Sequence, residues 1–174
     1  GDYMKIAMLD SGRKYFTPDW VKSFIYEAKA DGYTHVMLAV GNDGMRFLLD
    51  DMSITVNGTA YASADVSAAV HAGNTAYTSA SSGEWTESEM NEIFAAANAA
   101  GIEIIPLLNS PGHMDAILQA ASSLTGTTCS YNGSSRTIDV TNSTAGAPPP
   151  GVIYKENLQL APQGVQKFYI RRPV

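Results

Sequence analysis

The strongest constraint on the fold of this chain is a strand–helix–strand pattern that occurs twice. An apolar run at 4–9 is followed by a helix start, where Thr17 is a suitable N-cap and Pro18 occupies the first helical position. Gly32 is suited to end this helix in a left-handed conformation, and a second apolar run follows at 35–40. The apolar residues between these signals repeat at helical spacing and share one face: Val21, Phe24, Ile25 and Ala28.

The second unit repeats the same order of signals. Residues 86–89 read Thr-Glu-Ser-Glu, which is a capping box, and Gly101 closes the helix before the apolar run 102–108. Consecutive strand–helix–strand units form parallel strands with right-handed crossovers, so the pattern predicts an α/β fold. A further helix at about 114–122 and a strand at 167–170 extend it. The pattern alone fits both a doubly wound sheet and three to four βα units of a barrel, which needs ~250 residues when complete.

The segment 41–85 separates the two units and is long for a connection. It contains one hairpin signal, because 54–56 reads Ile-Thr-Val and is followed by Asn57-Gly58. The remainder is rich in Ala, Ser, Thr and Gly and has no strong periodicity. We therefore expect a long loop after the second strand, of the kind that is usually functional or poorly ordered.

The charge of the chain excludes several classes of partner. A formal net charge of −6 and a pI near 4.9 argue against nucleic acid and anionic membranes, which attract clusters of Lys and Arg. No apolar run approaches the ~20 residues of a membrane-spanning helix. Cys129 is the single cysteine, so no internal disulfide is possible. A neutral ligand such as a sugar is compatible with this composition.

Three segments together resemble glycoside hydrolase family 20, the β-N-acetylhexosaminidases, and especially their surface-attached bacterial branch. Residues 8–16 read MLDSGRKYF, residues 38–47 read LAVGNDGMRF, and residues 104–113 read IIPLLNSPGH. Their order and spacing resemble the ends of the family's first three barrel strands over residues 4–140. The resemblance implies a partial (β/α)8 TIM barrel, as one domain over 1–174, with a divergent tail at 145–174.

The resemblance also implies roles for individual residues. Arg13 would hold sugar hydroxyls through its fixed fork of donors, and His113 would lie beside the catalytic carboxylates. Asn42 and Asp43 would lie near the ligand. Asn109 stands where many relatives carry an acidic residue, so it would contribute hydrogen bonds and no proton relay.

Structural alternatives exist for the same residues. Arg13 would then be a surface charge beside a helix, and His113 would cap the helix that follows it. Trp85 fits a sugar-stacking residue and, equally, a residue that packs ahead of the capped helix. The histidines at 35, 71 and 113 lack ligand-like spacing, so no zinc site is expected, and no cofactor is implied.

The Asp-Glu pair that the family uses for catalysis is missing from this sequence. In family 20 the substrate's acetamido oxygen attacks the anomeric carbon, an Asp positions the acetamido group, and the adjacent Glu protonates the leaving oxygen. Residues 164–170 look like the fourth barrel strand, after which the pair is expected, yet Arg171 and Arg172 follow and no Asp-Glu dipeptide occurs anywhere. Residues 146–163 also lack the expected amphipathic helix. We hypothesise a disrupted reading frame; a divergent but genuine C-terminus is the alternative.

The resemblance therefore implies part of a β-N-acetylhexosaminidase that is inactive by itself, from an extracellular or cell-surface bacterial protein. Its partner would be a glycan containing N-acetylhexosamine, and the open edges of a partial sheet predict a homodimer or a tail folded over the open side. A non-catalytic glycan-binding module is the alternative function. A phosphate-binding domain that uses Gly41-Asn42-Asp43-Gly44 ranks last, because the loop matches no known phosphate motif.

Overall fold

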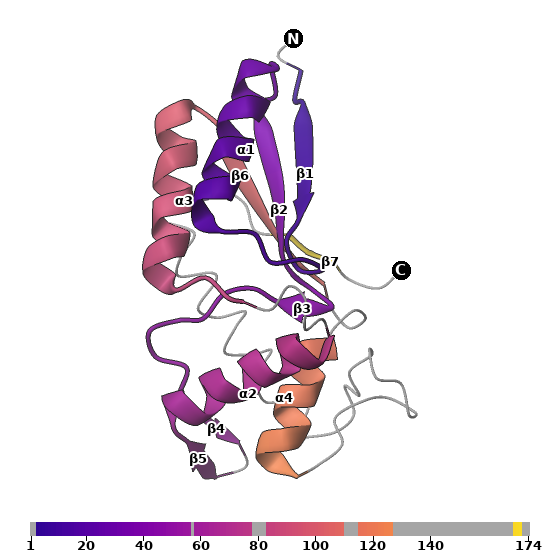
Figure 1. Cartoon of the computed structure of the whole chain (residues 1–174), viewed down its shortest axis with the longest axis vertical. Coiled ribbons are helices and arrows are strands. Elements are labelled where there is room, and N and C mark those ends of the chain that lie inside the picture. Colours follow the sequence, from indigo (N-terminus) through magenta and orange to yellow (C-terminus); the bar gives the residue numbers. More distant parts are fainter. Residues whose placement is uncertain (1–2, 57, 78–82, 110–114, 127–168, 172–174) are drawn as a thin grey trace.

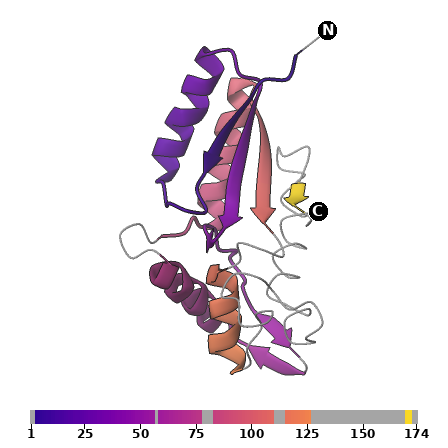
Figure 2. The same ribbon diagram turned by 90° about the vertical axis from the view of Figure 1, so that its right-hand side faces the viewer.

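A computed structural model describes residues 3–56, 58–77, 83–109, 115–126 and 169–171. Its centre is a parallel sheet in the order β1-β2-β6-β7 (Figures 1 and 2). The strands are β1 (Ile6–Asp10), β2 (His35–Asn42), β6 (Glu103–Asn109) and β7 (Tyr169–Arg171). Neighbouring strands run parallel throughout this path, which confirms the α/β class and agrees with a partial barrel. The short β7 confirms that a fourth strand follows β6 in space.

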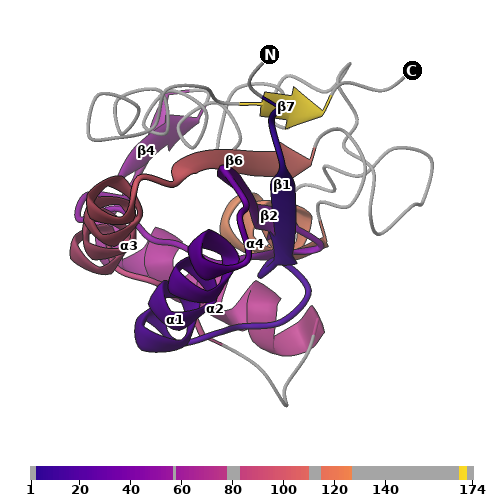
Figure 3. The same ribbon diagram turned by 90° about the horizontal axis from the view of Figure 1, so that it is seen from above.

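Two helices cover one face of this sheet. They are α1 (Pro18–Ala30) and α3 (Glu87–Ala100), and Figure 3 places both on the same side of the strands. Thr17 and Thr86 are their N-caps, and Thr86 forms the expected capping box with Glu89. Gly101 adopts the left-handed conformation at the C-cap of α3, with φ 73°. Both helix boundaries therefore follow from the local signals in the sequence.

The main core lies between these helices and the sheet. In β2, the alternating residues Val36, Leu38 and Val40 turn toward the helices and are fully buried. In β1, Ile6 and Met8 turn the other way and are 42% and 54% exposed. Large side chains fill the covered side: Ile25, Leu38, Ile93 and Ile104. One face of the sheet is thus a packed core, and the other carries apolar side chains that the described residues leave open along β1.

The segment after β2 folds as a compact insert. It contains β3 (Gly44–Met45), which pairs antiparallel with β2, and a hairpin of β4 (Ile54–Val56) and β5 (Thr59–Tyr61). The hairpin confirms the signal at Asn57-Gly58. The expectation of a loop for the rest is wrong, because α2 (Ser63–Tyr77) follows. Its buried residues do recur at helical spacing, but they are small or β-branched and gave a weak pattern: Val66, Ala69, Val70 and Gly73.

A fourth helix, α4 (Asp115–Thr125), packs against α2 beyond the C-terminal ends of the strands (Figures 1 and 2). The contact is close, because a Cβ on Gly73 would come within 2.5 Å of the Ala116 carbonyl oxygen. The sequence predicted this helix at about 114–122, in good agreement. The polar stretch and most of the tail, 127–168, lie outside the described residues.

Candidate functional site

The candidate site begins where β1 and β2 end side by side. Asp10 closes β1, and its Oδ2 accepts a hydrogen bond of 2.7 Å from Asn42 Nδ2 at the end of β2. The chain after β1 runs very close to β2, since a Cβ on Gly12 would lie 2.4 Å from the Asn42 backbone nitrogen. Glycine is therefore required at position 12 for this approach. The C-terminal ends of parallel strands are where barrel enzymes place their chemistry.

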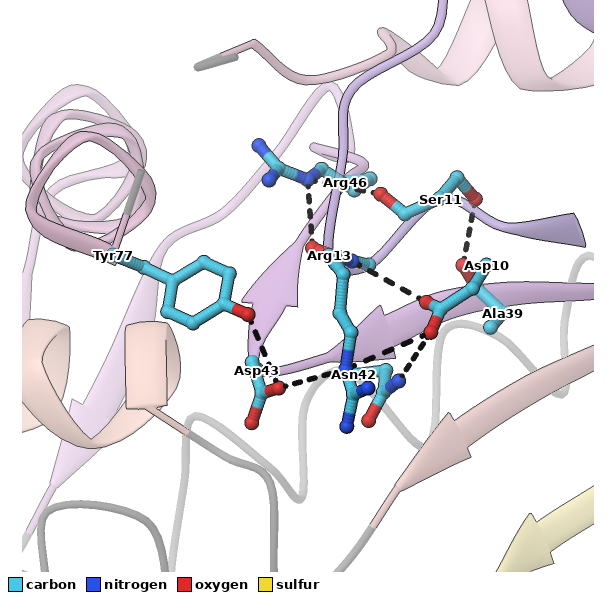
Figure 4. A network of polar contacts seen from close by, with 9 residues as sticks. Asp10, Ser11, Arg13, Ala39, Asn42, Asp43, Arg46 and Tyr77 are labelled. Atoms are coloured by element: carbon cyan, nitrogen blue, oxygen red, sulfur yellow. Dashed lines mark hydrogen bonds and ion pairs between the residues drawn. The ribbon is translucent and has the colours of Figure 1, made fainter. Parts of the chain in front are cut away.

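Arg13 lies at the centre of this edge (Figure 4). Its Nε donates to Asp43 Oδ2 at 3.1 Å, and its backbone nitrogen donates to Asp10 Oδ1 at 3.3 Å. The bonds recorded among the described residues use Nε and the backbone, and the side chain stays 53% exposed. The two terminal nitrogens therefore extend from a fixed Nε anchor, which suits them to donate to an oxygen-rich ligand.

Asp43 ties three segments together. Its backbone is left-handed, with φ 65°, which Asp tolerates better than most residues. The carboxylate is completely buried; Oδ2 accepts from Arg13 and also from the Tyr77 hydroxyl at 3.2 Å. The Asp43 carbonyl accepts from the Ala116 backbone nitrogen at 2.9 Å. Burial raises the pKa of Tyr77, and the neighbouring Asp43 charge raises it further, so the hydroxyl remains a donor at neutral pH.

A second layer lies beneath these residues and holds the loop after β1. Ser11 Oγ donates to the Ala39 carbonyl at 2.6 Å. Arg46 is fully buried, and its Nε donates to the carbonyls of Ser11 and Gly12, each at 3.0 Å. Burial lowers the pKa of the Arg46 guanidinium from its ordinary value, with Glu84 the largest opposing influence. This layer fixes the backbone from which Arg13 projects.

The insert is attached to the same edge by a buried amide. Asn74 in α2 accepts from the Met45 backbone nitrogen at 2.7 Å and donates to the Met45 carbonyl and to Glu84. Glu84 also accepts from the exposed His71 at 2.9 Å. Asn74 and Tyr77 were not expected at the site, because both belong to α2, in a segment whose sequence predicts a loop. A polar residue at the spacing of Val66 and Val70 was the available signal for Asn74.

The remaining residues proposed from the sequence have different outcomes. Trp85 exposes none of its surface, and its Nε1 donates to the Phe16 carbonyl at 2.7 Å. Trp85 therefore presents no ring face to a sugar. Of the two alternatives, packing ahead of the capped helix is confirmed, and the sugar-stacking role is wrong. Asn109 ends β6, and its backbone is in register with Arg171 of β7; its side chain is not among those that the structure describes. His113 lies outside the described residues altogether.

The described residues contain no group of three or more His, Cys, Asp or Glu that could hold a metal ion. Residues Gly41–Gly44 span the tight β2–β3 turn, in which Asp43 alone lies between the two strands; its buried carboxylate would repel a phosphate. None of the described helices is both long and apolar enough to span a bilayer.

Comparison with known proteins agrees with this architecture. The catalytic-domain model of glycosyl hydrolase family 20 matches residues 5–161. A solved structure of the pneumococcal virulence factor StrH, described in terms of N-glycan recognition and hydrolysis, is 38% identical, with a TM-score of 0.88. The match covers 95% of this chain and 41% of that one, so the chain spans about two fifths of the relative's length.

Two further structures are similar. One is a structure of the pneumococcal exo-β-D-N-acetylglucosaminidase StrH, described in terms of differential inhibition of its tandem catalytic modules, at 38% identity and a TM-score of 0.86 over 92% of this chain and 40% of that one. Dispersin B is 21% identical, with a TM-score of 0.67 over 97% of this chain and 48% of that one, and supports the fold alone. The parallel strand order, the polar edge at Arg13 and the family match agree, and the chain belongs to glycosyl hydrolase family 20.

Proposed function

We propose that Asp10, Arg13, Asn42 and Asp43 form part of a binding site for a terminal N-acetylhexosamine. The observation that carries the proposal is the anchoring of Arg13: Nε is fixed on the buried Asp43 carboxylate while half of the side chain remains exposed. A guanidinium held in this way presents its terminal N–H groups in one orientation and recognises a pair of hydroxyl oxygens. Asn109 and His113 remain proposed members of the same site.

The reaction that this site would serve is hydrolysis of a β-N-acetylhexosaminide with assistance from the substrate's acetamido group. That chemistry needs one carboxylate to position the acetamido group and another to protonate the leaving oxygen. The chain has no Asp-Glu dipeptide. Asp43 is fully buried and already bonded, and Asp10 already accepts from Asn42 and Arg13. We therefore expect that the 174-residue chain binds without hydrolysing.

Turnover of a chromogenic β-N-acetylglucosaminide by the purified chain tests this expectation. An active family 20 enzyme serves as the positive control, and Arg13→Met serves as the site variant. We expect no release above background, since a positioned general acid alone contributes ~10²–10⁴-fold. Robust release that Arg13→Met abolishes would show that another group supplies the acid, and that the inactivity proposed here is wrong.

A non-catalytic glycan-binding module is the second candidate. It is favoured by the same observation, a preorganised Arg13 beside acceptor groups, because binding needs no acid pair. The two candidates predict different results for a chimera in which an Asp-Glu pair is introduced after β7, on the corresponding segment of an active relative. Gain of hydrolysis would favour the enzyme; retained binding without hydrolysis in a folded chimera would favour the module.

Assembly and location are further parts of the proposal. On the face of β1 opposite the helices, Ile6 and Met8 are exposed, while β7 pairs with the far edge of β6. A second copy of the chain would cover this apolar face, as the expected homodimer requires. Analytical ultracentrifugation of the purified chain tests the proposed homodimer, and a chain that is monomeric at all concentrations would contradict it. We also propose an extracellular or cell-surface location in a bacterium, on the family branch to which the sequence is similar.

A further inference from the structure

Arg46 is a buried cation that makes its recorded hydrogen bonds to backbone carbonyls. It follows β3 between two fully buried apolar residues, Met45 and Phe47, and exposes none of its own surface. Nε donates to the carbonyls of Ser11 and Gly12, and Nη1 donates to the Gly83 carbonyl at 3.2 Å. Nη2 is buried and has no hydrogen-bond partner among the residues that the structure describes.

Burying a guanidinium with this set of contacts costs folding free energy, so its presence indicates a specific role. Burial of a charge is unfavourable unless it is paired or well hydrogen-bonded, and an apolar side chain of similar size would fill the same volume without that cost. The acceptors come from two segments that flank the candidate site: residues 11–12, after β1, and residue 83, before α3. One side chain therefore fixes both segments relative to β3.

The backbone around Arg46 is closely packed at Gly44. A Cβ on Gly44 would lie 2.4 Å from the Gly12 carbonyl oxygen and 3.0 Å from Arg46 Nη2. The Gly12 carbonyl, which Arg46 binds, thus lies directly against the β2–β3 turn that carries Asp43. Arg13 is the next residue along the chain, and its anchor on Asp43 depends on this registration.

We infer that Arg46 is a positioning residue that sets the place of Arg13 in the site. It touches no ligand itself; it fixes the carbonyls of Ser11 and Gly12, and through them the direction in which the Arg13 side chain leaves the backbone. The consequence for ligand affinity rests on the proposed function, whereas the consequence for the Arg13 geometry does not. A small misplacement of a binding group in a preorganised site can cost a large factor in efficiency.

The test compares Arg46→Met, which keeps the volume and removes the donors, with Arg46→Lys, which keeps the charge but cannot reach all three carbonyls. Ile93→Ala is the control, because it loosens the core beneath α3 without touching the candidate site. Two quantities are measured by NMR: hydrogen exchange of the Arg13 backbone amide and Nε–H, and the dissociation constant for N-acetylglucosamine.

We expect exchange at Arg13 to rise about tenfold or more in Arg46→Met, with Arg46→Lys intermediate, and affinity to fall by about the same factor. Ile93→Ala should leave both quantities at Arg13 near the wild-type values. The inference is overturned when Arg46→Met and Ile93→Ala give the same exchange rate at Arg13. It is also overturned when the wild-type chain binds N-acetylglucosamine and Arg46→Met binds it with the same affinity. Should the wild-type chain bind no sugar, the proposed function fails and the exchange comparison alone decides the inference. Should Arg46→Met not fold, Arg46→Lys decides it.

Discussion

The barrel part of the molecule and the insert are held together by different kinds of packing. In the barrel part, formed by β1, α1, β2, α3 and β6, branched aliphatic side chains such as Ile25 and Ile93 fill the space between helices and sheet. The insert packs against α4, and its helix α2 approaches α4 so closely that Gly73 lies against the backbone of Ala116. Packing in the barrel part depends on large side chains, whereas the contact between α2 and α4 depends on a residue without a side chain.

The candidate site lies where these two parts meet. The barrel part supplies Asp10 and Arg13, the insert supplies the Tyr77 hydroxyl, and α4 supplies the Ala116 backbone N–H; all of these but Asp10 converge on Asp43. The insert therefore does more than fill a connection, because its packing determines how the Arg13 anchor is held. Substitutions that disturb the packing of one part or the other test this difference between the two parts.

The largest effect is expected in the barrel core. Ile25→Ala removes a fully buried side chain from α1 and should lower the free energy of unfolding by ~2–5 kcal/mol. Urea denaturation measures this loss. Tyr26→Ala, on the exposed side of the same helix, should change stability by less than ~0.5 kcal/mol. Equal losses for the two variants would mean that α1 is not anchored by its apolar face.

The insert should respond to an added methyl group. Gly73→Ala places a Cβ 2.5 Å from the Ala116 carbonyl oxygen, so the helices must move apart, at a cost of ~1–3 kcal/mol. This exceeds the ~0.5–1 kcal/mol that Ala normally contributes over Gly inside a helix. Ala68→Gly, at an exposed position of α2, measures that helix preference alone. A net stabilisation by Gly73→Ala would break the proposed contrast between the two parts.

A smaller effect is expected at the start of α3. Thr86→Ala removes the side chain that accepts from the Glu89 backbone nitrogen and should cost about 1 kcal/mol of unfolding free energy. Ser88→Ala, exposed in the first turn, is the matched control and should be close to neutral. Thermal denaturation resolves the difference. Equal values would indicate that packing of α3, and not its cap, determines where the helix begins.

The smallest effect concerns the pH dependence of stability. Burial and Asp43 hold the pKa of Tyr77 above its ordinary value of 10.0, so the unfolded chain loses this proton first as pH rises. The stabilising contribution is present below about pH 10 and declines above it. Tyr77→Phe should make the fall in stability between pH 10 and 11.5 shallower. An unchanged slope would show that the Tyr77–Asp43 contact does not persist in solution.

The barrel part was predictable because its signals are local. Thr17, Thr86 and Gly101 mark helix ends by hydrogen-bond chemistry and backbone geometry, and the buried strands are rich in branched residues. The insert was less predictable, because a helix packed through alanine and glycine has little contrast between its faces. The hairpin at 54–61 was the exception, since Asn57-Gly58 is itself a turn signal.

The site was predictable only in part, for a related reason. Arg13, Asn42 and Asp43 could be placed at strand ends from the order of elements. The residues that hold them could not: Tyr77 comes from the missed helix, and Arg46 acts through carbonyl oxygens that carry no sequence identity. Trp85 shows the opposite error, because a conspicuous aromatic residue proved to be core.

The most direct test of the central claim is titration of N-acetylglucosamine into the ¹⁵N-labelled chain, compared with Arg13→Lys and with Lys14→Met as an exposed neighbouring control. The account predicts saturable shifts at residues 10–13 and 42–43. Arg13→Lys keeps the charge but loses the fork of donors, and should weaken binding about tenfold or more, while Lys14→Met binds as the wild type does. No saturable shift, or shifts that Arg13→Lys leaves unchanged, would contradict a sugar site at this edge of the sheet.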